Sequence, residues 1–130
     1  MSSKIAIKTN LFPSKSPLEW AIASNDILYT AQIPINDEGN VVLGGIEAQT
    51  KQVFANLIHT LECANATLDD VLQVLIYVTK REHLQVVNSV YSSYFKSIYP
   101  NRAAFIISGL AREDMLVEFV VYAIAHNSKI

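Results

Sequence analysis

Arg102 places a permanent positive charge at the start of an apolar segment. It directly precedes residues 103–107, which are all apolar. A guanidinium does not lose its proton in proteins, so it must either bind an anion or remain in water. Because its planar fork of donors matches a carboxylate, we expect Arg102 to bind a carboxylate of the protein or of a ligand.

Glu118 is the one charged residue in a second apolar segment, residues 115–125. Charged side chains are rarely buried unless they are paired or functional. The segments 103–108 and 115–125 have the composition of strands, and the loop "GLARED" between them is long enough for a hairpin. The sequence therefore predicts that these two strands pair in antiparallel fashion.

In such a hairpin, Glu118 would face Ala104 or Phe105, within diagonal reach of Arg102. Two interpretations of the pair remain open. The two residues form a structural ion pair, or Glu118 is a charge that protects an exposed strand edge. Alternatively, Arg102 binds a ligand carboxylate while Glu118 orients a water molecule or transfers a proton.

Other catalytic or metal sites have little support in the sequence. Cys63 is the single cysteine, which excludes an intrachain disulfide, and the three histidines are too widely separated to indicate metal ligation. Motifs of nucleophilic serine enzymes and of phosphate-binding glycine loops are missing. We therefore expect no metal and no cofactor.

The composition narrows the class of protein. The 130 residues fit one domain, 1–130, and the net charge of −2 with scattered basic residues gives no surface for nucleic acid. The N-terminus lacks the apolar core of a signal peptide, and no apolar run is long enough to span a bilayer. We expect a cytoplasmic protein with no membrane partner.

Apolar periodicity predicts two helices within a sequence rich in strands. Apolar residues at helical spacing predict a first helix over about 46–64. A second apolar stripe predicts a helix that starts near Lys80, where Thr79 and Glu82 have capping-box spacing, and that ends at Pro100. The predicted strands span residues 4–9, 18–24, 27–35, 71–78, 103–108 and 115–125. The order β-β-β-α-β-α-β-β indicates an α+β fold, a single sheet of about six strands with both helices on one face.

The opposite sheet face would then lack a cover. Both sides of the segment 115–125 are apolar, and 51% of the chain is hydrophobic while only 17% is charged. Soluble domains average roughly 45–50% apolar and about 25% charged residues. We therefore expect the uncovered face to pack on another copy of the chain.

Several segments together resemble the RidA/YjgF family, the reactive intermediate deaminases, over nearly the full length of the chain. The segments that carry the resemblance are "YTAQIP" at 29–34, "GGIEAQTKQVFANL" at 44–57, "LDDVLQVLIYVT" at 68–79, "VVNSVYSSYF" at 86–95, "YPNRAAF" at 99–105 and "MLVEFVVYAIA" at 115–125.

The resemblance implies a chorismate-mutase-like fold and a homotrimer with inward-facing sheets and three intersubunit clefts. It implies that Arg102 binds the carboxylate of a 2-imino or 2-enamino acid there. Glu118 would assist the water that hydrolyses the C=N bond, which yields a 2-keto acid and ammonia. A small carboxylate-bearing ligand is thus the expected partner.

The sequence also departs from the family pattern at the expected cleft. Leu18 stands where active members usually have a tyrosine, and Ala31 replaces a serine–glycine pair. Ala104, two residues beyond the arginine, is a neutral change. The resemblance assigns Leu18, Ala31 and Ala104 to the substrate-binding cleft, with two hydroxyl groups lost.

Three functions are therefore weighed. The first is an enamine/imine deaminase, which the retained Arg102 and Glu118 favour. The second is a non-catalytic trimer that binds small carboxylates such as 2-keto acids, or a regulatory protein, which the lost hydroxyls favour. The third, a ribonuclease or translation inhibitor, is disfavoured by the net negative charge.

Overall fold

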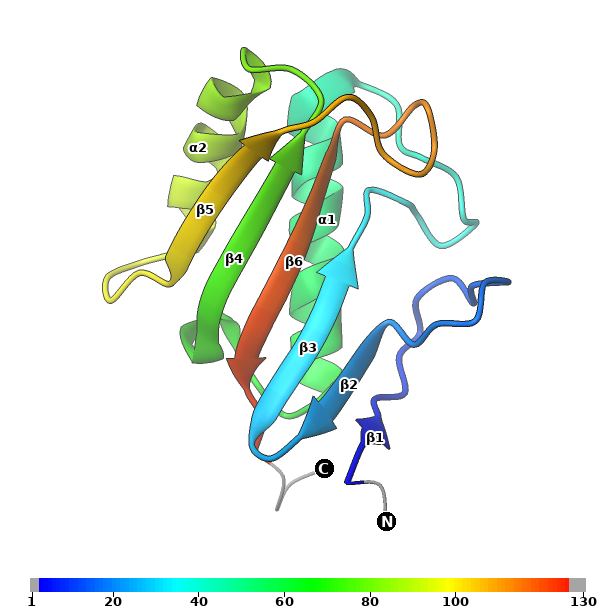
Figure 1. Cartoon of the computed structure of the whole chain (residues 1–130), viewed down its shortest axis with the longest axis vertical. Coiled ribbons are helices and arrows are strands. Elements are labelled where there is room, and N and C mark those ends of the chain that lie inside the picture. Colours follow the sequence, from blue (N-terminus) through cyan, green and yellow to red (C-terminus); the bar gives the residue numbers. More distant parts are fainter. Residues whose placement is uncertain (1–2, 127–130) are drawn as a thin grey trace.

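Six strands form one sheet, and two helices cover one of its faces (Figure 1). The computed structural model describes residues 3–126. Its elements are β1 (Ile5–Ala6), β2 (Ala21–Ser24), β3 (Ile27–Gln32), α1 (Gly45–Cys63), the short 3-10 helix η1 (Leu68–Asp70), β4 (Val71–Val78), α2 (His83–Tyr94), β5 (Asn101–Ile106) and β6 (Val117–Ile124). The predicted fold class and element order are confirmed.

The strands lie in the order β1-β2-β3-β6-β4-β5. The last strand, β6, is inserted between β3 and β4 and runs antiparallel to both, whereas β5 lies at the edge, parallel to β4. The predicted hairpin of 103–108 with 115–125 is therefore wrong. Helix α2 connects β4 to β5 as a crossover, which makes these two strands parallel, and β6 takes the central position that suits its two apolar faces.

The first helix matches its prediction to within a residue at each end, but the second is shorter than predicted. Its N-cap residue, Glu82, has helical backbone angles and makes no side-chain capping bond, so the expected capping box with Thr79 is absent. The helix stops at Tyr94, well before Pro100, because Phe95 adopts an extended backbone. The Phe95 ring is buried in the core, 5.7 Å from the Phe54 ring.

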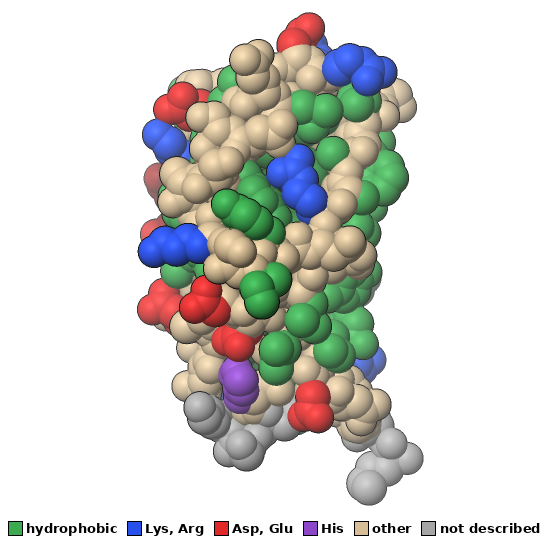
Figure 2. Space-filling view, turned by 90° about the vertical axis from the view of Figure 1, so that its left-hand side faces the viewer, with side chains coloured by type: hydrophobic (Ala, Val, Ile, Leu, Met, Phe, Trp, Pro, Cys, Tyr) green, Lys and Arg blue, Asp and Glu red, His purple; other side chains and the backbone are tan. Residues whose placement is uncertain are grey.

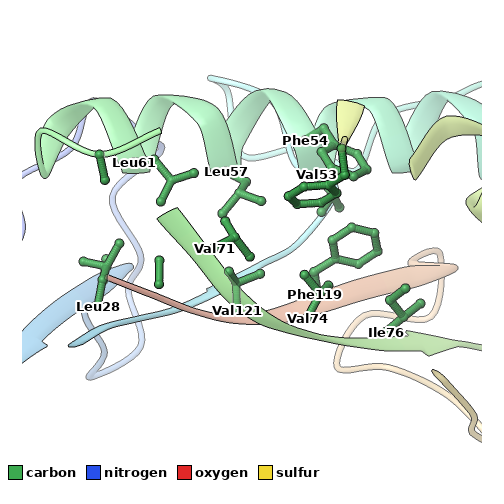
Figure 3. Packing of buried hydrophobic residues seen from close by; sticks show 14 of the residues in the cluster. Leu28, Val53, Phe54, Leu57, Leu61, Val71, Val74, Ile76, Phe119 and Val121 are labelled. Carbon is green, nitrogen blue, oxygen red and sulfur yellow. The ribbon is translucent and has the colours of Figure 1, made fainter. Parts of the chain in front are cut away.

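The core lies between α1 and the covered face of the sheet (Figure 3). Phe54 of α1 meets Phe119 of β6 edge to face, with ring centroids 5.3 Å apart, and Tyr94 of α2 stacks on Phe54 at 4.2 Å. Both phenylalanines are fully buried. Because Phe119 is held in this way, the residues on either side of it in β6 must point to the other face of the sheet.

The other face of the sheet is apolar and uncovered. Figure 2 views the molecule from the side of α2 and β5, and hydrophobic side chains gather along the flank of this open face. Strand register places the following residues there, none of them buried: Ile22, Tyr29, Ala31, Leu75, Tyr77, Ala103, Phe105, Val120 and Tyr122. The predicted uncovered apolar face is therefore present, and contiguous apolar surface of this kind marks an interaction site.

Candidate functional site

Arg102 lies on edge strand β5 and points to the helix-covered face of the sheet. Its neighbour across the ladder is Val74, which is buried beneath the helices. The Nη2 atom donates to Asn88 Oδ1 at 2.6 Å, and the guanidinium carbon lies 4.7 Å from the centroid of the Tyr91 ring. The ion pairs within residues 3–126 do not include Arg102. Its charge is held in place by an amide and an aromatic face, and no carboxylate within residues 3–126 pairs with it.

The two residues that hold Arg102 come from one face of α2. Asn88 and Tyr91 are three positions apart, so both side chains emerge on the same side of the helix, next to β5. Burial raises the pKa of the Tyr91 hydroxyl, and the positive charge of Arg102 opposes that rise. This pair was not predicted from the sequence, although its i, i+3 spacing on the helix that precedes β5 was a usable signal.

Glu118 lies on central strand β6 and points to the open face. Its flanking residues, Val117 and Phe119, are buried on the helix side, and its neighbour across the ladder is Tyr77. Glu118 is partly buried, and burial raises the pKa of its carboxyl group. No ion pair involves Glu118 in the part of the chain that the structure describes.

A cavity of about 580 Å³ lies beside Glu118. Leu18 and Ala31, both predicted site residues, line it together with Glu118, whereas Arg102 and Ala104 do not. The volume is in the range of small-molecule sites, and the walls are largely apolar with a few polar groups, as such sites usually are. Three of the five predicted residues therefore share one cavity within a single chain.

The predicted contact between Arg102 and Glu118 does not exist within one chain. Strand β4 separates their two strands, and the two side chains project from opposite faces of the sheet. The prediction was wrong because it depended on the hairpin, which would have made the two strands neighbours. A single ligand cannot contact both side chains of the same protomer in this arrangement.

One wall of the cavity is a set of interlocked loops. Trp20 Nε1 donates to the carbonyl of Phe12 at 2.8 Å, and the Phe12 ring packs against Gly39. Gly39 has φ of 81°, and a Cβ placed there would lie 2.6 Å from the Phe12 ring, so glycine is required. Arg112 Nη1 donates to the Gly39 carbonyl at 2.6 Å. Arg112 is thus a cavity residue that was not predicted from the sequence, where residues 109–114 were assigned only as a loop.

Across residues 3–126, no three side chains of His, Cys, Asp or Glu are grouped so that they would hold a metal ion. Neither described helix combines the length and apolar character needed to cross a bilayer.

Comparisons with known proteins agree with this fold. The family described as "Endoribonuclease L-PSP" matches residues 9–125. A RutC family protein of Pyrococcus abyssi is 38% identical over 109 residues, which is 82% of this chain and 85% of the relative. Protein HMF1 of Saccharomyces cerevisiae is 33% identical over 87 residues, 67% of each chain.

A solved structure provides the same comparison in three dimensions. The Rid family protein YyfA from Yersinia pestis superposes with a TM-score of 0.88 at 38% identity, covering 94% of this chain and 99% of that chain. Sequence and structure thus agree over nearly the whole domain, and the chain belongs to the RidA/YjgF family.

Proposed function

We propose that the protein hydrolyses 2-imino or 2-enamino acids to 2-keto acids and ammonia, in clefts between the subunits of a homotrimer. The observation that carries the proposal is Glu118, a carboxyl group with a raised pKa that lines a ligand-sized cavity on the open sheet face. Arg102, already oriented by Asn88 and Tyr91, supplies a carboxylate anchor.

The proposed reaction places Glu118 in an acid–base role. As water adds to the imine carbon, the Glu118 carboxylate accepts one proton from the water and passes it to the nitrogen, which gives a neutral tetrahedral carbinolamine. In the collapse, Glu118 takes the proton of the carbinolamine hydroxyl and delivers it to the amino group, the C–N bond breaks, and ammonia and the 2-keto acid are released. A carboxyl group with a raised pKa is better matched to such proton transfers than an ordinary one. The imine is already electrophilic, so fixing it beside an oriented water supplies much of the catalysis.

The same geometry supports a site between subunits, as the proposed homotrimer requires. The two proposed binding groups project from opposite faces of one protomer, so a ligand that uses both must lie between two protomers. Packing of the apolar open faces around a threefold axis would bury the exposed aromatic residues. It would also bring edge strand β5, with Arg102, beside the Glu118 cavity of the next subunit.

A second candidate function is a non-catalytic binder of small carboxylates, or a regulatory protein. It is favoured by Leu18 and Ala31, because both line the cavity where the family pattern has hydroxyl groups. Ser14 and Ser16 line the same cavity, however, and supply hydroxyls from different positions. This is why we place hydrolysis first.

The test generates 2-imino acids in situ with an amino-acid oxidase and follows their decay. The wild type should accelerate the decay, while Glu118→Gln and Arg102→Ala should not. Arg81→Gln removes an exposed arginine outside the cavity and is the matched control, with wild-type activity expected.

Binding is measured separately with 2-oxobutyrate. It should raise the melting temperature of the wild type and not that of Arg102→Ala. If 2-oxobutyrate stabilises the wild type in this way, but imino acids with several different side chains decay no faster, the protein is a non-catalytic carboxylate binder. Equal shifts in both proteins would refute the role of Arg102.

A further inference from the structure

Arg112 places a guanidinium at the Glu118 cavity, and the proposed reaction does not use this cation. Four charged side chains line this cavity: Lys15, Glu19, Arg112 and Glu118. Arg112 forms no ion pair within residues 3–126, although Glu113 and Asp114 follow it in the chain. Its bond to the Gly39 carbonyl occupies Nη1 and leaves the other donors of the guanidinium.

One hydrogen bond, to the Gly39 carbonyl, orients the exposed side chain of Arg112. Gly39 is held by the Phe12 ring, and the loop that contains Gly39 is closed by Asn36, whose Oδ1 accepts the backbone N–H groups of Glu38 and Asn40 at 3.0 and 3.1 Å. A cation oriented in this way loses less side-chain entropy when it binds an anion. Lys15 is exposed as well, but no comparable hydrogen bond anchors its side chain in the described part of the chain.

Arg112 and Glu118 are separate features of the cavity. They do not form an ion pair, and burial is the cause of the raised pKa of Glu118. A cation close to Glu118 would have favoured the carboxylate form. The cavity therefore has a proton-transferring carboxyl group in one place and an uncompensated guanidinium in another.

We propose that Arg112 binds a second carboxylate, at the far end of the ligand, so that the preferred substrates are imino acids with acidic side chains. This inference rests on the proposed function, because it takes the reacting end of the ligand to be held by Glu118 and by Arg102 of the partner subunit. The cavity volume of about 580 Å³ leaves room beyond a four-carbon imino acid.

The test compares two five-carbon 2-keto acids by isothermal titration calorimetry on the full chain. 2-Oxoglutarate ends in a carboxylate, and 2-oxopentanoate ends in a methyl group. The wild type should bind 2-oxoglutarate about tenfold more tightly than 2-oxopentanoate. This factor lies at the low end of what a hydrogen bond to a charged group contributes to affinity. In Arg112→Gln, whose amide still provides a donor for the Gly39 carbonyl, the ratio of the two affinities should fall to about one. Arg81→Gln, outside the cavity, should keep the wild-type ratio.

A ratio near one in the wild type, or a tenfold ratio retained in Arg112→Gln, would overturn the proposal and show that Arg112 only ties the loops together. The wild-type ratio involves no substitution, so it decides the question even if Arg112→Gln is unstable. Imine decay is followed on the same samples. A tenfold preference for 2-oxoglutarate without faster imine decay supports carboxylate binding by Arg112 and refutes hydrolysis. Faster imine decay without that preference refutes only carboxylate binding by Arg112. If neither keto acid binds, both proposals fall.

Discussion

Mixed trimers give a direct test of whether Arg102 and Glu118 act on one ligand from two subunits. Arg102→Ala and Glu118→Gln should each be inactive alone in the imine-decay assay. The two variants are co-expressed with different affinity tags and purified over both, so that every trimer contains both kinds of subunit. In the proposed homotrimer each cleft takes its arginine and its glutamate from different subunits, so some clefts in a mixed trimer should recover both wild-type residues.

The expected recovery follows from cyclic symmetry. In a ring with two subunits of one variant and one of the other, a single cleft receives its arginine from a Glu118→Gln chain and its glutamate from an Arg102→Ala chain. Mixed trimers should therefore show about a third of the wild-type activity per trimer. The control is each variant co-expressed with itself under the two tags, which should stay inactive.

A different result would refute the geometry. If both residues acted within one chain, each chain would lack one of them, and mixed trimers would be as inactive as their parents. The structure argues against that arrangement, since β4 lies between the two strands and the side chains project from opposite faces of the sheet.

Three further predictions concern stability and assembly. Burial raises the pKa of Glu118 above its ordinary 4.5, so the stabilisation from its bound proton is complete below about pH 4.5 and is lost as the pH rises through the raised pKa. In urea unfolding, the wild type should therefore lose stability relative to Glu118→Gln between pH 4.5 and neutral pH; the opposite slope would mean that the carboxylate form is stabilised. Gly39→Ala should destabilise the fold by about 1–3 kcal/mol in chemical denaturation, because the methyl group would overlap Phe12, whereas Gly45→Ala, with a similar positive φ but open space, should cost only about 1 kcal/mol. Val120→Lys places a charge on the open sheet face. Native mass spectrometry should then show monomers in place of the proposed trimer. An intact trimer would show that the subunits pack through another surface.

The elements were predictable because they depend on local patterns. The 3.6-residue spacing around Val53, Phe54 and Leu57 identified α1, and the short apolar runs identified β4 and β6. The pairing of strands was not predictable in this way. Proximity in sequence favoured a hairpin, but the crossover through α2 and the apolar character of both faces of β6 determined the order, and both effects act over long distances.

The site was predictable in part for the same reason. Leu18, Ala31 and Glu118, which the family resemblance assigned to one intersubunit cleft, line one cavity within the single chain. The surroundings of Arg102 were missed, because its contacts to Asn88 and Tyr91 depend on how α2 docks beside β5. Arg112 was missed because the Gly39 carbonyl that holds it lies 73 positions away in the chain.

The central position of β6 has a consequence for biosynthesis. Before β6 has been synthesised, the nascent chain can form one half-sheet from β1, β2 and β3 and another from β4 and β5. The strand that joins them is made last, so each half presents an unpaired inner edge until Val117–Ile124 has left the exit tunnel. We expect the sheet to close only once β6 has emerged from the ribosome, and fragments that stop before β6 to aggregate through these two edges.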